Sequence, residues 1–407
     1  MEKLDYSDER VAILTATRDR VDGLQKTLQS ITDDLSKNDR LSLCSIVIDD
    51  STEESARAKN RETVSHFAPL FPRGVYYFGK EDYLSFLSSL SLDQREVVQA
   101  TCKPLGASYY DSVGPRNLAL LLSYSEDIVL IVDDDIVFYD SKPLANTSSI
   151  QRMIRAVMTG ENDIIGAHLD GIPDQSTLEH LDDLIHAQLH PNVGTLPSYA
   201  NPFARVTPRE QGWRRRLPAY IASGGVMAFR TTLHEAHFPK IYNDDWHWIS
   251  YHHRTNKKKV TIDNQATVIH LPSEWRFPTE ETLRREFVGE VIFEAMHQYS
   301  EKSGLNCWDF PANVDWGSVA RQYYQFLCKI MEEVRTLGTT RSLPNSPFTR
   351  YSQILPHLEA VARDDMLQDR TLYLNLVQAY IDEVSQWKKM ITNLKATFPS
   401  WLRVKAG

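Results

Sequence analysis

Three consecutive carboxylates follow the most hydrophobic predicted strand of the chain. Residues 128–132 are all apolar and run directly into Asp133, Asp134 and Asp135. In an extended segment, residues two apart face the same side, so Asp133 and Asp135 could both approach one divalent cation. Asp134 would then point away, toward loop backbone or a ribose. The mutual repulsion of these carboxylates is costly unless a cation or donors offset it. An isolated run of three acids fits a solvated acidic turn equally well.

A pair of acids nearer the N-terminus also stands at the end of a predicted strand. The sequence predicts a β-α-β unit at the start of the chain. It has a strand at 11–14, apolar residues at helical spacing over 21–31 and a second strand at 45–48. Asp49 and Asp50 follow the second strand directly. Open α/β sheets bind ligands at the carboxyl edge of their strands, so these two acids are candidate ligand contacts. The alternative is that they only cap an acidic loop.

The pattern of strand and helix continues through the first two thirds of the chain. One inserted helix is predicted over 81–101, and proline at the start of 114–117 marks the beginning of another. The sequence therefore predicts an α/β fold with a mostly parallel sheet. Its further strands are expected at 75–78, 128–132, 164–167, 226–229 and 266–270.

Beyond residue 278 the strand pattern stops. Amphipathic helices are predicted at 283–299, 319–337 and 372–394. We therefore expect two domains, an α/β domain at 1–278 and a helical C-terminal domain at 279–407. The helical part could shape an acceptor site or form a homodimer contact.

Seven short motifs, in order, resemble the family-2-like GT-A glycosyltransferases across about residues 10 to 275. That resemblance implies an inverting transferase that moves a single sugar from a nucleotide-sugar donor to an acceptor hydroxyl. The motifs are V-A-I-L-T-A-T-R-D-R, S-I-V-I-D-D-S-T, G-P-R-N-L-A-L, V-L-I-V-D-D-D-I, A-S-G-G-V-M-A-F-R, N-D-D-W and V-I-H-L.

The resemblance also implies roles for individual residues. Asp133 and Asp135 match a D-x-D motif that holds Mn²⁺ or Mg²⁺ on the donor diphosphate, and His270 matches a histidine that completes the metal shell, although it could be a structural histidine. Asp244 matches the general base, with Asp245 as the alternative because Asn243 replaces the usual acid. The matching positions on the nucleotide side are Thr15, Arg18, Asp49, Asp50, Arg116 and Asn117. The residues themselves add three candidate contacts to the nucleotide-sugar, which are Asp134, Gly224 and Gly225.

Other conspicuous residues have two interpretations each. The paired glycines could let backbone approach the donor sugar or form a tight turn. Trp246, Trp248 and Trp275 could stack on a sugar or pack in the core. Trp213 and 214–216 lie on a long polar stretch, where they could close over a diphosphate or form a solvated basic patch.

Composition narrows the partners and the location. Asp and Glu outnumber Lys and Arg by 54 to 45, which argues against nucleic-acid binding. No apolar leader and no run of about 18 apolar residues is present, so we expect a soluble protein with no transmembrane segment. The four cysteines lie far apart, which favours the cytoplasm.

Three other kinds of protein share parts of this pattern. A sugar nucleotidyltransferase would need a glycine-rich first loop, but residues 15–20 contain no glycine. A phosphoacceptor receiver domain would not explain the acids near 133 and 244 together. A non-catalytic nucleotide- or carbohydrate-binding relative stays open because of Asn243. A UDP-sugar is the favoured donor, while the acceptor is not indicated.

Overall fold

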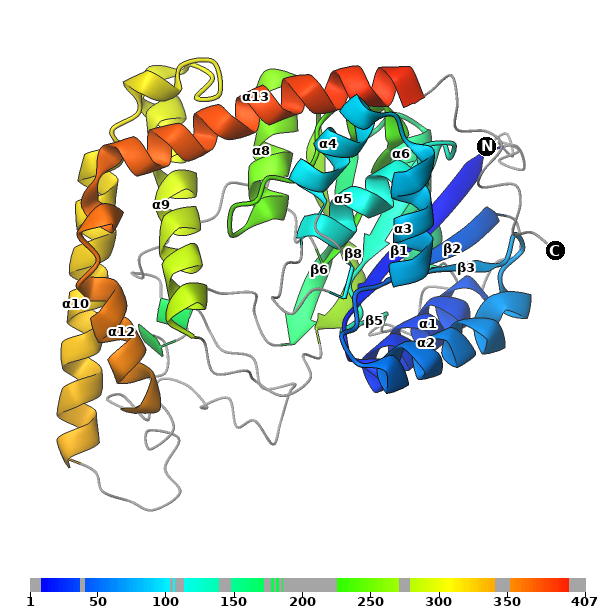
Figure 1. Ribbon diagram of the computed structural model, residues 1–407, viewed down its shortest axis with the longest axis horizontal. Helices are drawn as coiled ribbons and strands as arrows, with labels where there is room; N and C mark the ends of the chain where they lie inside the picture. Colours follow the sequence, from blue (N-terminus) through cyan, green and yellow to red (C-terminus); the bar gives the residue numbers. More distant parts are fainter. Residues whose placement is uncertain are drawn as a thin grey trace.

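The computed structural model places an α/β sheet unit beside a group of long C-terminal helices (Figure 1). It describes residues 9–36, 41–102, 105–106, 113–138, 148–171, 177–178, 181–182, 185, 225–270, 279–340 and 352–394.

The strands form one eight-stranded sheet with the order β3-β2-β1-β4-β7-β6-β8-β5. Strands β3, β2, β1 and β4 pair in parallel, as do β6 and β8, whereas β7 and β5 run antiparallel to their neighbours. The α/β class and the mostly parallel sheet are therefore confirmed. The strands are β1 (Arg10–Thr17), β2 (Ser42–Asp49), β3 (Val75–Phe78), β4 (Ile128–Val132), β5 (Ile136–Phe138), β6 (Ile164–Gly171), β7 (Val226–Arg230) and β8 (Val260–His270).

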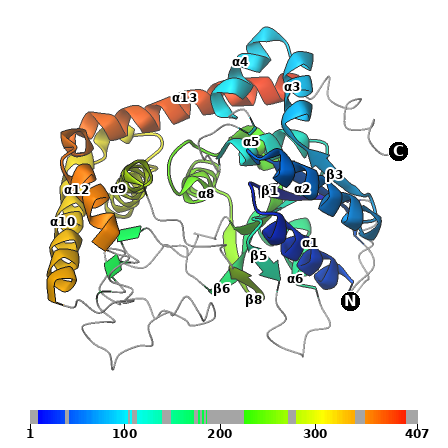
Figure 2. The ribbon, with the colours of Figure 1, turned by 60° about the horizontal axis from the view of Figure 1, so that its bottom comes forward.

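Helices cover both faces of this sheet (Figure 2). Along β1, Val11 and Ile13 pack in the cluster that contains Leu24 of α1, whereas Ala12 and Leu14 pack in the cluster that contains α5. This alternation follows from the two-residue period of a strand that is buried on both faces. The helices around the sheet are α1 (Val21–Leu35), α2 (Glu54–Phe67), η1 (Ala68–Leu70), α3 (Lys80–Ser89), α4 (Leu92–Thr101), α5 (Val113–Leu122), α6 (Ser149–Met158), η2 (Thr231–Glu235) and α8 (Asp244–Thr255).

The single helix predicted over 81–101 is two helices, α3 and α4. Ser91 accepts a hydrogen bond from the backbone N–H of Gln94, and the Gln94 side chain accepts one from the N–H of Ser91. This reciprocal capping box begins a new helix, because it satisfies donors that a continuous helix would have bonded internally. A second difference is β5, which is too short to show a strand period.

The helical C-terminal region is confirmed, and α13 lies along the sheet unit as well as along the other C-terminal helices (Figure 1). The hydroxyl of Tyr380 donates to the carbonyl of His237, and the indole of Trp387 donates to the carbonyl of His234, each at 2.8 Å. One apolar cluster runs from the sheet face into these helices, and the domain division after residue 278 stays a prediction. The elements are α9 (Glu280–Ser303), η3 (Pro311–Asn313), α10 (Trp316–Thr340), η4 (Ser352–Ile354), α12 (Leu355–Ala362), η5 (Asp365–Gln368) and α13 (Arg370–Leu394).

Candidate active site

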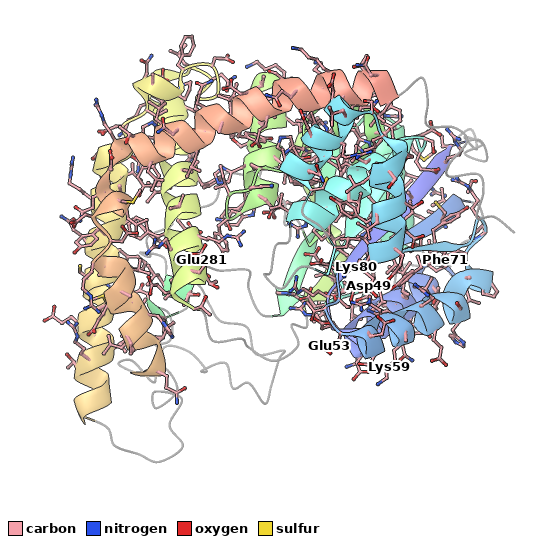
Figure 3. The ribbon with its side chains drawn as sticks, in the orientation of Figure 1. Asp49, Glu53, Lys59, Phe71, Lys80 and Glu281 are labelled. Carbon is pink, nitrogen blue, oxygen red and sulfur yellow. The ribbon has the colours of Figure 1, made fainter. Side chains whose placement is uncertain are left out.

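The carboxyl ends of β1, β2 and β4 lie side by side, and this brings their polar loops together. Thr17 is in register with Asp49 across the β1–β2 pair, and the N–H of Asp50 donates to the carbonyl of Thr17 at 2.8 Å. Figure 3 labels Asp49 where β2 ends, near Lys80, the first residue of α3. Polar side chains far apart in the sequence therefore meet at one edge of the sheet.

Two arginines hold the three acids that follow β4. The guanidinium of Arg20 donates to Asp134 at 3.0 Å and to Asp135 at 2.7 Å, and the hydroxyl of Thr17 donates to Asp134 at 2.7 Å. The guanidinium of Arg116, at the start of α5, donates to Asp133 at 2.8 Å. Arginine suits such sites because its planar fork matches carboxylate geometry and stays charged.

The same Arg116 also reaches the first residue of α8. Its Nη1 donates to Oδ2 of Asp244 at 2.9 Å, while its Nη2 contacts Asp133. Asp244 and Asp245 are both buried, each 6% exposed. Burial alone would lower the pKa of Arg116, but the charges of Asp133 and Asp244 outweigh it and raise that pKa, so the guanidinium stays charged. One cation therefore links the end of β4 to the start of α8.

Burial and neighbouring charge separate the pKa values of the three acids after β4. Burial raises the pKa of Asp133, and it raises the pKa of Asp134 to about 7. Burial also acts on Asp135, but the hydrogen bond and charge of His270, together with Arg20, outweigh it and lower the pKa of Asp135 to about 2. Nε2 of His270 lies 3.5 Å from Oδ2 of Asp135.

The donor atoms at this edge fit a divalent metal in kind. Asp133, Asp135 and His270 supply carboxylate oxygens and an imidazole nitrogen, a set that Mn²⁺ accepts. Their exposure is compatible with access, since 30% of the Asp133 side chain and 21% of the His270 side chain are exposed. Within the described ranges no three His, Cys, Asp or Glu side chains already converge on one point. Because Arg20 and Arg116 already donate to these carboxylates, a cation bound there would compete with guanidinium groups.

The acids after β2 have different partners. Asp49 is fully buried and accepts hydrogen bonds from the amide of Asn60 at 3.0 Å, the hydroxyl of Tyr77 at 2.7 Å and the N–H of Ser51 at 2.8 Å. These groups belong to the β2–α2 unit and to β3, and they hold the Asp49 side chain inside the fold.

Asp50 instead links the first loop to a more distant segment. It accepts from Arg18 at 2.9 Å and from the N–H of Gly106 at 2.8 Å. Of the two predicted nucleotide contacts after β2, Asp50 is thus the one paired with another predicted site residue, Arg18.

Two predicted nucleotide contacts lie inside the core. Asn117 is fully buried, and its amide donates to the carbonyls of Thr101 and Phe238 and accepts from the N–H of Phe238. Thr15 is also fully buried on β1, and its hydroxyl has no hydrogen-bond partner among the described residues. In this structure Asn117 joins the start of α5 to the segment before α8 and does not face the sheet edge.

The aromatic residues of α8 pack in the core. Trp246 contacts Phe293 with ring centroids 5.2 Å apart, and Trp248 stacks on Phe238 at 4.9 Å.

The carbonyl of Gly225 accepts from the N–H of Asp133 at 2.9 Å, which ties β7 to the acids after β4. The other residues singled out from the sequence, which are Trp213, 214–216, Gly224 and Trp275, lie outside the described residues.

Arg20 and Asp19 also lie at this sheet edge, although their sequence positions did not predict a role for them. Asp19 has a positive φ of 54°, which is uncommon for a residue other than glycine. Its carboxylate accepts from the N–H of Thr52 at 3.0 Å and from the Thr52 hydroxyl at 2.9 Å, so it joins the first loop to the second. The available signal was the run of charged residues from Arg18 to Arg20 directly after a strand.

Comparisons with known proteins give only distant likenesses. Neither a protein-family model nor a curated protein sequence matches the chain. The chain is similar to the solved structure of mannosyltransferase PcManGT from Pyrobaculum calidifontis in complex with GDP-Man and Mn²⁺, at 12% identity and a TM-score of 0.43, covering 97% of this chain and 90% of that one.

Two further solved structures are similar to it at the same level. One is S. aureus TarS 1-349 in complex with UDP-GlcNAc, at 12% identity and a TM-score of 0.41, covering 95% of this chain and 92% of that one. The other is glucosyl-3-phosphoglycerate synthase from Mycobacterium tuberculosis in complex with Mn²⁺, UDP and glucosyl-3-phosphoglycerate, at 12% identity and a TM-score of 0.39, covering 74% of this chain and 82% of that one. Similarity this distant establishes neither a shared family nor a shared activity, so the chemistry of the sheet edge has to carry the assignment.

Proposed function

We propose that the chain is a glycosyltransferase of the GT-A type that moves one sugar from a nucleotide-sugar donor to an acceptor hydroxyl. The observation that carries this proposal is the position of Arg116, which contacts Asp133 at 2.8 Å and Asp244 at 2.9 Å. A candidate metal ligand and a candidate general base thus lie within the span of one guanidinium. Direct displacement requires such proximity, because the leaving group and the attacking hydroxyl bind on opposite sides of one carbon atom.

The donor side of the site is assigned to the acids after β4 and to the first loop. Asp133, Asp135 and His270 would hold Mn²⁺ or Mg²⁺. When bound, the cation would act as a Lewis acid on the donor diphosphate, whose developing charge would otherwise make it a poor leaving group. Arg18 and Asp50, paired at 2.9 Å, are the candidates for the nucleoside side.

The acceptor side is assigned to Asp244, with Asp245 as the alternative. The carboxylate of Asp244 would take the proton of the acceptor hydroxyl while the hydroxyl oxygen forms a bond to the anomeric carbon. The bond from that carbon to the diphosphate oxygen breaks in the same step, and the configuration inverts. The guanidinium of Arg116 donates to the Asp244 carboxylate at 2.9 Å and would hold it in place for this step.

Several finer assignments belong to the same proposal. We favour a UDP-sugar as donor and the division into a transferase unit, 1–278, and a helical unit, 279–407.

The four cysteines are free thiols, which favours a reducing compartment such as the cytoplasm. Among the described residues, no helix is long and apolar enough to cross a membrane. Leu305, Phe310 and Met366 are 48%, 44% and 65% exposed on the helical unit, where a homodimer contact could form.

The test is a thermal-shift panel with UDP, GDP and dTDP, each with and without Mn²⁺. A ligand that binds only the folded state raises the melting temperature by mass action, so one nucleotide is expected to stabilise the protein in a metal-dependent way. Asp133→Ala/Asp135→Ala should abolish that shift. Glu281→Gln, an exposed carboxylate of α9, is the control and should keep it. No shift from any nucleotide in the unaltered protein would overturn the proposal.

Donor turnover separates a transferase from a non-catalytic binding protein. The nucleotide that stabilises the protein is supplied as its sugar conjugates, and nucleotide release is followed with the protein at high concentration. Release that depends on metal and on Asp244 supports catalysis. Metal-dependent binding without any release, with each donor sugar and a panel of hydroxyl acceptors, would identify a binding protein instead.

A further inference from the structure

Helix α9, the first helix of the C-terminal region, touches the loop that leads into α8. A Cβ atom at Gly289 would lie 2.5 Å from the carbonyl oxygen of Tyr242 and 2.7 Å from the Tyr242 Cβ. Real Cβ atoms do not approach backbone this closely, so glycine is required at this point. The backbone of α9 therefore lies directly against the residue that precedes Asn243 and Asp244.

Asn243 turns the chain into α8 and is bonded to α9. It has φ 61° and ψ 42°, the left-handed conformation that asparagine adopts more readily than most residues. Its carbonyl accepts from the N–H of His247 at 3.0 Å, which begins α8. Its Nδ2 donates to Oε1 of Glu290 at 2.9 Å, and Glu290 is only 2% exposed. The conformation explains why asparagine stands before Asp244.

A third contact lies one turn further along α9. The ring of Phe293 is 5.2 Å from that of Trp246 and 5.9 Å from that of His247, measured between centroids. Gly289, Glu290 and Phe293 occupy one face of α9, because residues three and four apart are neighbours on a helix surface. This face holds the loop and the first turn of α8 at three successive points.

We propose that Glu290 is a positioning residue for Asp244. This inference rests on the proposed function, because it assumes that the carboxylate of Asp244 accepts the proton. Glu290 fixes the side chain of Asn243, and Asn243 sets the direction in which α8 begins. Asp244 is the first residue of that helix, and its carboxylate is thereby held 2.9 Å from Arg116. The helical C-terminal region thus contributes to the geometry of the reaction.

The first test compares Glu290→Ala with Glu290→Gln. Alanine removes the acceptor for Asn243, whereas glutamine keeps a carbonyl oxygen in the same place. A displacement of roughly 1 Å at a reacting group can lower turnover by about 100-fold, so we expect kcat to fall by about 10- to 100-fold in Glu290→Ala. The KM for the donor and the metal-dependent thermal shift should stay unchanged, since the donor side is not touched. Glu290→Gln should restore most of kcat, and Glu281→Gln is the matched control on the same helix.

An exchange of the two partners tests the direct contact. Asn243→Asp alone places two carboxylates against each other and should lower kcat, while aspartate still tolerates the left-handed conformation. Adding Glu290→Gln restores a donor and an acceptor with the polarity reversed, so the double variant should recover activity. Equal losses in the single and double variants would overturn the proposal.

Hydrogen exchange supplies a measurement that does not depend on activity. In Glu290→Ala the amides of the first turn of α8, including the His247 N–H, should exchange at least about 10-fold faster, while the amides of β1 and β4 keep their exchange rates. Unchanged exchange there, or a kcat equal to that of the unaltered protein, would overturn the inference. If the proposed function fails, nucleotide binding and turnover are absent from the unaltered protein, but the change in exchange still reports whether Glu290 orders α8.

Discussion

After β2, the carboxylate of Asp49 is held by a buried amide, a phenol and a backbone N–H, whereas after β4 the acids are held by guanidinium groups from other segments. Both groups follow a parallel strand at the same edge of the sheet. The partners of Asp49 are parts of the packed fold. Arg20 and Arg116 are long charged side chains that reach these acids from the first loop and from α5. Aspartates that follow a strand therefore have neutral hydrogen-bond donors as partners at Asp49 and charged guanidinium groups as partners after β4.

The largest effect is expected at Asp244 of α8, which shares Arg116 with the acids after β4. Asp244→Asn removes the proposed base and should lower kcat on the order of 100- to 10,000-fold, because the attacking hydroxyl would then keep its proton. Nucleotide release under saturating donor measures it, and the thermal shift with nucleotide and Mn²⁺ should persist. Asp245→Asn is the matched variant. A greater loss in Asp245→Asn than in Asp244→Asn would move the base to Asp245.

The next largest effect is expected when Arg116 is removed from Asp133 and Asp244. Arg116→Met leaves two buried carboxylates without their cation and should cost about 3 kcal/mol in the free energy of unfolding, near the lower limit for a broken buried pair because 30% of the Asp133 side chain is exposed. Millimolar Mn²⁺ should restore part of this stability.

Arg18→Met is the control for Arg116→Met, because Arg18 pairs with Asp50, which is not a proposed metal ligand. Chemical denaturation with and without Mn²⁺ measures both variants. Equal responses to Mn²⁺ in the two variants would contradict the idea that only the β4 acids exchange an arginine for a metal.

A smaller effect is expected at Asp49. Asp49→Asn replaces one carboxylate oxygen, which accepts hydrogen bonds, by an NH₂ group, which can only donate. This group would face other donors, so we expect a loss of about 2 kcal/mol in the free energy of unfolding. Metal-dependent nucleotide binding should survive in the folded protein, because Asp49 faces Asn60 and Tyr77. Tyr77→Phe, which removes one donor, should reproduce part of the loss in stability. A variant that keeps its stability but loses nucleotide binding would place Asp49 in the donor site instead.

Acidification should act mainly through four buried histidines in η2, in α8 and in the segment between them. Asp134 opposes them in part, because its pKa is raised to about 7 and the folded protein takes up a proton there in the same range. Burial lowers the pKa of His234 and His252 to about 3 and of His237 and His247 to about 4. Below the ordinary value of about 6.5, the unfolded chain binds protons that the folded chain does not. As the pH falls from about 6.5 toward 4, the four histidines should therefore lower the free energy of unfolding by more than the single Asp134 raises it.

Each of these histidines contributes up to about 1.4 kcal/mol per pH unit in that window. His234→Phe should remove the contribution of one histidine to the pH dependence of the free energy of unfolding. Phenylalanine suits the site, because neither ring nitrogen of His234 has a partner among the described residues and its neighbours Tyr124 and Phe229 are aromatic. Denaturation midpoints at several pH values measure the slope. An unchanged slope in this variant would mean that His234 is protonated in the folded protein.

The sequence by itself determined the class of fold and the position of the acids along the chain. Strand periodicity and the motifs after each strand depend on local residues, so the strand ends at Asp49 and Asp133 could be predicted directly. The strand order, which brings β4 beside β1, could not be read locally. That order is why Thr17 and Arg20 reach the acids after β4.

Tertiary structure alone decided which polar residues face the site. Asn117 stands next to Arg116 in the sequence, yet one is bonded to core backbone and the other spans two acids, because adjacent residues on a helix point about 100° apart. The contact between Glu290 and Asn243 crosses 47 residues of sequence and depends on how closely α9 packs at Gly289. Such packing is set by three-dimensional fit, which has no local signature in the chain.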